Sequence, residues 1–223
     1  NLSNNLYDYL HITNNDDTLN NSYYRSNSLN DLIYSENEIK LIASIFKTSG
    51  KIANTFLYSN ATKKNFIKNA KNYKIIHIAT HGIVNEFMKN MPGLIFSYSN
   101  KNLRDSLFSP DDYILYSKEF SNLALSADLI TLSACESGIG ETVNGEGIIN
   151  MTRELIYSGA KNILASLWKI SDKPTMLLMI DFYKNIQKGD NYSLSLRKAK
   201  LKMLNNEKTN YPIHWAGFVL VGN

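Results

Sequence analysis

Two stretches decide how the chain folds: Ile-His-Ile-Ala-Thr-His-Gly at residues 76–82 and Asp-Leu-Ile-Thr-Leu-Ser-Ala-Cys-Glu-Ser-Gly at residues 128–138. Each begins as an apolar run with little polar alternation, which is typical of a strand covered on both faces. Each ends in a reactive side chain close to a glycine. The first stretch delivers His81, and the second delivers Cys135, the only cysteine of the chain.

Helical patterns flank these two strands. Before residue 76, the sequence predicts a helix from Ser35 with acids in its first turn, a short strand over 55–58 and a helix over 61–70. After residue 138, it predicts a helix from Gly145-Glu146-Gly147 to Tyr157 that Gly159 ends, and then a buried strand over 163–168. Ser171 and Asp172 precede Pro174, which is typical of a helix start, and the helix continues over 176–186. A helix over 193–205 and a strand over 215–221 follow. The inward-facing residues are expected to be Ile39, Ile42, Ala43 and Phe46, then Phe66 and Ile67, then Ile148, Ile149, Leu155 and Ile156.

The stretch between His81 and residue 122 is less regular. It holds short apolar pieces at 93–96 and 113–116, and the turn residues Pro92, Ser109, Pro110 and Asp111. We interpret it as a hairpin-like insertion between two neighbouring core strands.

Strands that alternate with helices predict an α/β protein with a mostly parallel sheet covered on both faces. Sites in such sheets form at the carboxyl ends of the strands. His81 and Cys135 both lie just past such ends. If the two strands are neighbours, both side chains open into one crevice.

Composition limits the classes of protein that fit. A chain of 223 residues can form one domain with a sizeable core. Residues 1–30 are rich in Asn, Ser, Asp and Tyr without periodicity, so we expect a linker or cap there and a folded domain over residues 31–223. Because the chain starts with Asn instead of Met, we expect it to be part of a longer protein.

The charge and the apolar stretches indicate a cytoplasmic protein. The net charge of +4 is spread along the chain, so we expect no direct contact with nucleic acid. No apolar stretch approaches the roughly 20 residues of a spanning helix, and the first residues lack the features of a secretory signal. We therefore expect no membrane association, and a single cysteine fits a reducing compartment.

The pairing of His81 with Cys135 suggests a definite chemistry. A thiol becomes a strong nucleophile as the thiolate, and an imidazole within reach can remove its proton. Backbone N–H groups of Gly82 and Cys135 are the expected donors to an oxyanion. The bland alternative is that Cys135 is a small buried hydrophobic residue, and the strand that ends in His-Gly favours the catalytic interpretation.

Five motifs in this order resemble a CHAT domain. They are His-Ile-Ala-Thr-His-Gly at 77–82, Ala-Asp-Leu-Ile-Thr-Leu-Ser-Ala-Cys-Glu-Ser-Gly-Ile-Gly at 127–140, Gly-Glu-Gly at 145–147, Ser-Gly-Ala-Lys-Asn-Ile-Leu-Ala-Ser-Leu-Trp at 158–168 and Trp-Ala-Gly-Phe-Val-Leu-Val-Gly at 215–222. CHAT domains are caspase-like cysteine peptidases related to separases, usually attached to helical repeats or other regulatory regions. The resemblance runs from about Leu32 to the C-terminus.

The resemblance implies a caspase-like three-layer α/β/α sandwich and an intracellular cysteine endopeptidase that cuts a protein partner. It makes His81 the catalytic histidine, Cys135 the nucleophile and Gly82 part of the oxyanion hole. The spacing of 54 residues between His81 and Cys135 is close to the separation of about 50 in caspases. The resemblance also implies control by other regions of a longer parent chain, such as helical repeats, and no cofactor is expected. Four histidines and one cysteine, with His77 and His81 as the only close-set pair, argue against a zinc site.

The resemblance leaves substrate specificity open. The context Ser-Ala-Cys-Glu-Ser-Gly departs from the Gln-Ala-Cys signature of animal caspases, so caspase specificity for aspartate is not implied. Separases cut after basic residues, which requires an acid in the specificity pocket. Asp172 is the leading candidate, with helix capping as the alternative, and Glu136 and Trp168 are further candidates for substrate contact. Asp128 is expected to anchor the start of its strand.

Two other functions stay open. The first is a non-catalytic interaction or scaffold module that keeps the caspase-like fold. The second is an acyltransferase or hydrolase that uses the same two residues on another acyl group. His77, within the buried strand, is expected to be a hydrogen-bonded core histidine, and Glu146 is expected to fix the loop after Cys135 or to cap the next helix.

Overall fold

The computed structural model describes residues 32–85, 91–97, 109–133 and 146–222, and a four-stranded sheet in the order β1-β5-β6-β7 lies at its centre. The first three strands run parallel, and β7 pairs with β6 in the antiparallel direction. The predicted mostly parallel sheet is confirmed. The strands are β1 (Ile75–Ile78), β5 (Leu129–Leu132), β6 (Asn162–Ser166) and β7 (Phe218–Gly222).

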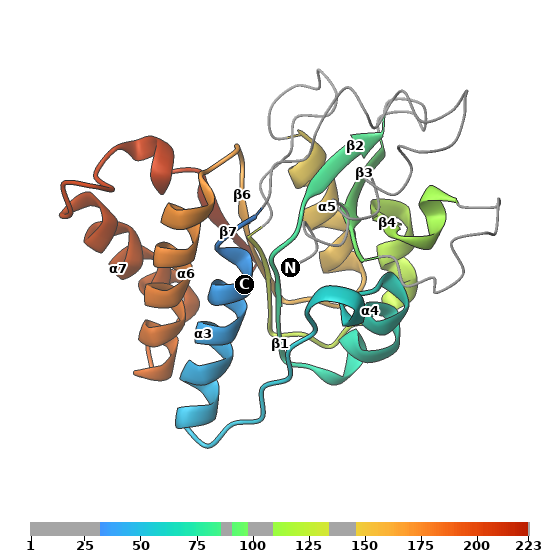
Figure 1. The fold of residues 1–223 in the computed structure, drawn as a ribbon, viewed down its shortest axis with the longest axis horizontal. Helices are drawn as coiled ribbons and strands as arrows, with labels where there is room; N and C mark the ends of the chain where they lie inside the picture. The colour runs from blue at the N-terminus through green and yellow to red at the C-terminus, as the bar shows by residue number, and fades with distance from the viewer. Residues whose placement is uncertain (1–31, 86–90, 98–108, 134–145, 223) are drawn as a thin grey trace, which may run out of the picture.

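Helices cover both faces of this sheet (Figure 1). One face carries α3, α6 and α7, and the other carries α4 and α5. Two buried apolar clusters fill the spaces between the layers, with Leu129 and Leu164 on the α6 side and Ile130 and Ile163 on the α5 side. The three-layer sandwich is therefore confirmed. The helices are α3 (Ser35–Thr48), α4 (Lys63–Asn69), α5 (Glu146–Tyr157), α6 (Asp172–Gln187) and α7 (Tyr192–Leu204).

The insertion after His81 forms a second, antiparallel sheet in the order β2-β3-β4, as the hairpin-like pattern predicted. Its strands are β2 (Gly82–Asn85), β3 (Met91–Ile95) and β4 (Ile114–Tyr116). Pro92, predicted as a turn residue, lies instead in β3 opposite Val84. A proline fits there because the pairing of β3 with β4 begins only at Gly93, so no ladder bond to β4 is lost.

A buried lysine ties the insertion to α4. Lys63 is 8% exposed, and its Nζ donates to the carbonyl oxygens of Asp111 (2.8 Å) and Ile114 (2.9 Å). It also forms an ion pair with Glu119 at 2.8 Å. These three partners satisfy an ammonium group that is otherwise costly to bury.

Two helical faces differ from the prediction. In α5, Ile148, Met151 and Leu155 are buried, whereas Ile149 and Ile156 are 48% and 37% exposed. The buried positions follow the i, i+3, i+7 spacing of a helical stripe, and the exposed isoleucines each lie one position past it. Ile67 of α4 is likewise 42% exposed, whereas Phe66 packs against the core as predicted.

The strand predicted over residues 55–58 is wrong. The chain is irregular from residue 51 to 57 and then forms the 3-10 helix η2 (Tyr58–Asn60). Phe56 and Tyr58 are each 39% exposed. A strand needs a partner edge for its backbone groups, and no strand described by the structure pairs with this segment.

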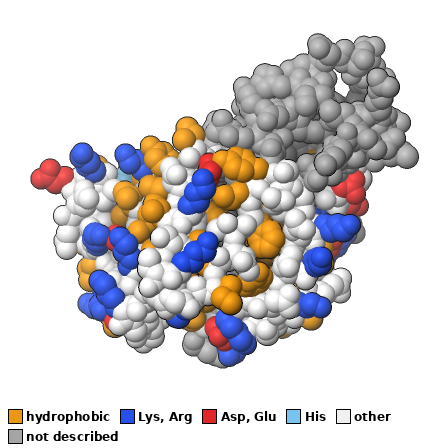
Figure 2. All heavy atoms as spheres, turned by 60° about the horizontal axis from the view of Figure 1, so that its bottom comes forward, with side chains coloured by type: hydrophobic (Ala, Val, Ile, Leu, Met, Phe, Trp, Pro, Cys, Tyr) orange, Lys and Arg blue, Asp and Glu red, His pale blue; other side chains and the backbone are white. Residues whose placement is uncertain are grey.

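The charged side chains visible in Figure 2 are scattered over the face shown and mixed with apolar ones. Several pair locally, such as Lys198 with Asp190 and Lys202 with Asp181, each at 2.7 Å. None of the described helices is long and apolar enough to cross a membrane.

Asp128 pairs with Lys161 at 2.7 Å, which lowers the pKa of Asp128 and anchors the start of β5 as predicted.

Gly159 ends α5 as predicted, and it gives a test of how tightly the layers meet. Its φ is +108°, and a Cβ there would lie 2.1 Å from the carbonyl oxygen of Leu125. Gly189 after α6 has a similar φ of +95° but open space around it.

We expect Gly189→Ala to lower the free energy of unfolding by about 1 kcal/mol through backbone strain, and Gly159→Ala to lower it by about 3 kcal/mol because the clash adds to that strain. Denaturant unfolding measures both, and equal losses would contradict the described contact between Gly159 and Leu125.

Candidate active site

His81 lies at the junction of the two sheets. It follows the end of β1 by three residues, directly precedes β2 and is 4% exposed. The backbone N–H of Ile95 donates to the carbonyl oxygen of His81 at 3.0 Å, and the hydroxyl of buried Thr80 donates to the carbonyl oxygen of Ile95. β3 thus holds the main chain at His81 and the side chain of the residue before it.

The strand that leads to Cys135 is the direct neighbour of the strand that leads to His81. β1 and β5 pair in parallel from Ile75 with Leu129 to Ile78 with Leu132, an offset of 54 residues. The N–H of Ser133 donates to the carbonyl oxygen of Ile78 at 3.0 Å and continues the pairing past the last residue of β5. The condition set by the sequence, that the two strands be neighbours, is met.

Cys135 and Glu136 lie outside the described residues. By sequence, Cys135 follows Leu132 by three positions, as His81 follows Ile78. The described part of the chain resumes at Glu146, the first residue of α5.

Gly82 opens β2 and is buried. It lies opposite Leu94 of β3. Neighbouring residues of an antiparallel ladder alternate between pairs that exchange hydrogen bonds and pairs that do not. Because the pair before it, His81 with Ile95, is hydrogen-bonded, the N–H of Gly82 points away from β3. That direction is compatible with a donor to a bound oxyanion.

Asp172 is the first residue of α6, and its carboxylate accepts a hydrogen bond from the backbone N–H of Tyr34, which precedes α3. Burial raises the pKa of Asp172, the bond from Tyr34 opposes this rise, and the nearby charge of Glu38 adds to it. Ser171, not Asp172, is the capping position of α6. The acid therefore bridges the starts of two helices, while its expected role in specificity stays a prediction.

Trp168 follows β6 and is half-buried. Its indole N–H donates to the carbonyl oxygen of Ile213 at 3.2 Å, and a Cβ on Gly217 would lie 2.7 Å from its ring. Trp168 thus packs against the segment that leads into β7. Its proposed contact with substrate stays a prediction.

Sequence reasoning missed a buried carboxyl group beside β1. The sequence pattern explains Glu38 only as an acid in the first turn of its helix, but Glu38 is 1% exposed, and its Oε1 lies 2.7 Å from Nε2 of His77. The signal was available, since Glu38 precedes the buried Ile42 by four residues and so lies on the apolar stripe of α3. His77 is a hydrogen-bonded core histidine, as predicted.

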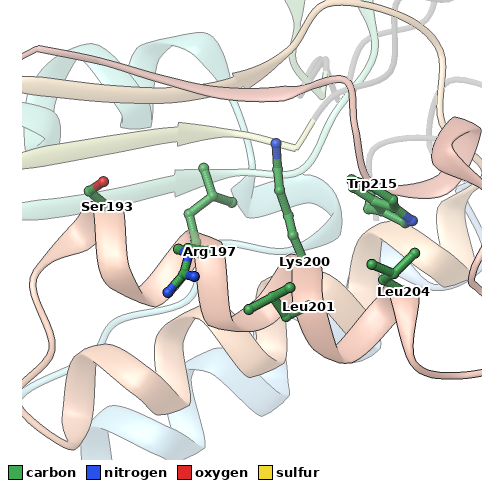
Figure 3. Close-up of a pocket in the computed structure, with 7 residues that line it drawn as sticks. Ser193, Arg197, Lys200, Leu201, Leu204 and Trp215 are labelled. Atoms are coloured by element: carbon green, nitrogen blue, oxygen red, sulfur yellow. The ribbon is translucent and has the colours of Figure 1, made fainter.

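A shallow groove of about 260 Å³ lies elsewhere, along α7 (Figure 3). Leu201, Leu204 and Trp215 line it together with the stem of Lys200. The Nζ of Lys200 donates to the carbonyl oxygen of Phe218 at 2.6 Å, and burial lowers the pKa of Lys200. No residue of β1 or β5 lines this groove, so we separate it from the candidate active site. Within the described ranges, no group of three or more His, Cys, Asp or Glu is placed to hold a metal ion.

Comparisons with known proteins agree with the resemblance of the motifs. Tetratricopeptide repeat protein 28 of Mus musculus is 28% identical over 112 residues, and that of Homo sapiens is 26% identical over the same length. These residues are 50% of this chain but only 4% of each curated relative. The CHAT domain family matches residues 4–223, which include most of the segment that the sequence left outside the resemblance. Because this match spans nearly the whole chain, and because the sheet and its insertion agree with a caspase-like fold, the protein belongs to the CHAT domain family.

Proposed function

We propose that the protein is a cysteine endopeptidase that hydrolyses a peptide bond of a protein partner with Cys135 and His81. The observation that carries the proposal is the parallel pairing of β1 with β5. Its offset equals the spacing of His81 and Cys135, so each residue follows its strand by the same number of positions. Membership of a caspase-like family supports the same assignment.

During the reaction, one proton would move from Cys135 to His81 and then to the leaving amine. His81 removes the proton from the thiol, and the thiolate of Cys135 attacks the carbonyl carbon of the scissile bond. The N–H of Gly82, directed away from β3, and the N–H of Cys135 would stabilise the oxyanion that forms. When the C–N bond breaks, His81 gives the proton to the leaving amine, and water then hydrolyses the thioester with His81 as the base.

The relatives suggest how such an activity would be controlled. Their name describes tetratricopeptide repeat proteins, and this chain covers only a small part of them. We infer that helical repeats, in the same chain or in a partner, regulate the peptidase, and that it acts in the cytoplasm. A regulated domain is expected to be weakly active alone, so the assays below include a thiol-specific readout that requires no turnover.

Replacement of Cys135 by Ala, or of His81 by Ala, should abolish cleavage of a fluorogenic peptide library, with a loss of at least about a thousandfold in kcat/KM. Ser158→Ala is the control, because Ser158 follows α5 and precedes β6, at the edge of the sheet opposite to that where β1 and β5 end. It should retain activity, and circular dichroism should show all variants folded. Cleavage by the Cys135→Ala variant would contradict the assignment of the dyad. Wild-type protein whose thiol shows no enhanced reactivity and that cleaves no peptide would favour the non-catalytic scaffold.

We further propose that Asp172 selects a basic residue before the cut. The support is its position after β6, at the sheet edge where β1 and β5 also end, and a half-buried carboxylate that a bound cation would stabilise. Its bond to the N–H of Tyr34 gives it a second, structural role.

Two substitutions separate these roles of Asp172. Asp172→Asn keeps an oxygen for the Tyr34 N–H but removes the charge, whereas Asp172→Ala removes both. Both should lower kcat/KM for Arg- or Lys-containing peptides by about tenfold to a hundredfold relative to neutral ones, and only Asp172→Ala should lose about 1 kcal/mol of stability. Profiling that shows no basic preference in the wild type, or the same preference in Asp172→Asn, would remove Asp172 from the specificity pocket.

A further inference from the structure

A network of buried polar side chains lies between the sheet and the helices α3 and α6. Nε2 of His77 is 2.7 Å from Oε1 of Glu38, and Nδ1 of His77 is 3.2 Å from the hydroxyl of Tyr183. That hydroxyl is 2.8 Å from the hydroxyl of Thr131. Nε2 of His77 also lies 3.3 Å from the hydroxyl of Ser133. The network thus joins β1 and β5 to both helices.

The hydrogens of this network can be assigned from its partners. A carboxylate only accepts, so Nε2 of His77 carries the hydrogen that faces Glu38. With that hydrogen on Nε2, Nδ1 accepts from the Tyr183 hydroxyl, which accepts in turn from Thr131. Burial raises the pKa of Tyr183, which keeps its hydroxyl protonated and able to donate. In this tautomer Nε2 has one hydrogen, which the hydroxyl of Ser133 at 3.3 Å shares with Glu38, and that hydroxyl donates its own hydrogen to the carbonyl oxygen of Ile78 at 3.4 Å.

Stability alone is a weak explanation for such a network. The surroundings are apolar, with Phe46 and Phe182 in ring contact with Tyr183. Buried hydrogen-bonded groups contribute little net stability, and apolar residues of similar volume often replace a set of buried polar partners without loss. What the network does supply is geometry, because a side chain with all its partners in place has one orientation.

The network lies on the two neighbouring strands, β1 and β5, that lead to the proposed dyad. In sequence, His77 of β1 precedes His81 by four residues, and Ser133, the first residue after β5, precedes Cys135 by two. The bond between His77 and Ser133 crosses from β1 to β5 at the last described position before Cys135. It adds a side-chain link to the backbone bond from Ser133 to Ile78.

We propose that His77 is a positioning residue that, held by Glu38, fixes Ser133 and thereby sets where the chain leaves β5 toward Cys135. The proposal rests on the proposed dyad of His81 and Cys135. It also makes α3 the element through which a contact on the outside of the domain can reach the dyad, because Glu38 belongs to α3. An attacking group displaced by about 1 Å can cost a hundredfold in rate, so a small change in this link has a large effect.

The single cysteine allows a direct test on the 223-residue chain. The alkylation rate of Cys135 by iodoacetamide is measured from pH 5 to 10 and gives the apparent pKa of the thiol. The wild type should titrate below the usual value of about 8.5, and His81→Ala should return the thiol toward it. His77→Leu, which keeps bulk but no polar atom, should move the profile toward that of His81→Ala. It should also lower kcat on a fluorogenic peptide by about tenfold to a hundredfold, with KM changed by less than about threefold.

A conservative variant and a matched pair of smaller changes complete the test. His77→Gln presents an amide N–H near the place of Nε2 and should restore kcat to within about threefold of the wild type. If His77→Leu fails to fold, Ser133→Ala serves instead and should lower kcat by about threefold to tenfold. Ser158→Ala removes an equally buried hydroxyl at the end of α5 and should leave kcat unchanged.

The outcomes separate the two proposals. If His81→Ala shifts the alkylation profile and folded His77→Leu does not, the positioning role alone is overturned. If the wild-type thiol titrates at its ordinary pKa and neither variant shifts the profile, the dyad and the positioning role are overturned together. Equal loss of kcat in Ser133→Ala and Ser158→Ala also contradicts the proposal, because the effect would then come from a lost buried hydroxyl anywhere in the core.

Discussion

The parallel pairing of β1 with β5 is the contact on which the site depends. Both strands are covered on two faces, so their backbone groups have no water to replace a lost partner. A slip of one residue would also turn every apolar side chain of a strand to the opposite layer. The register from Ile75 with Leu129 to Ile78 with Leu132 is therefore strongly fixed. The segments that continue past Ile78 and Leu132 therefore begin at fixed positions.

The two layers around these strands differ in kind. On the α5 side, the contacts are apolar, through residues such as Ile130 and Leu155. On the side of α3 and α6, polar groups interrupt the apolar packing, with Glu38, His77 and Tyr183 joined by hydrogen bonds. An apolar layer can supply burial energy with some tolerance in geometry, whereas a satisfied polar network admits few arrangements. The fold thus combines a stabilising layer with an orienting one.

Much of this architecture could be predicted from local pattern. Uninterrupted apolar runs predicted the core strands, and Gly159 predicted a helix end. That the strands before His81 and Cys135 are neighbours was only a condition in the sequence, and the structure meets it. The errors concern non-local facts. Whether residues 55–58 meet a partner strand, and whether Ile149 faces the core, depends on segments far away in the sequence. The candidate site was predictable to the level of its two strands, but the role of Glu38 was missed because an acid in a first helical turn already has a local explanation.

The distance between a ring nitrogen of His81 and Sγ of Cys135 tests the central claim most directly. A crystal structure of the chain in which a peptidyl chloromethyl ketone has reacted would measure it. The account predicts a thioether on Sγ of Cys135 and an imidazole nitrogen within about 4 Å of that sulfur. A Cys135 side chain buried on the opposite face of the sheet from His81, without reaction, would contradict it.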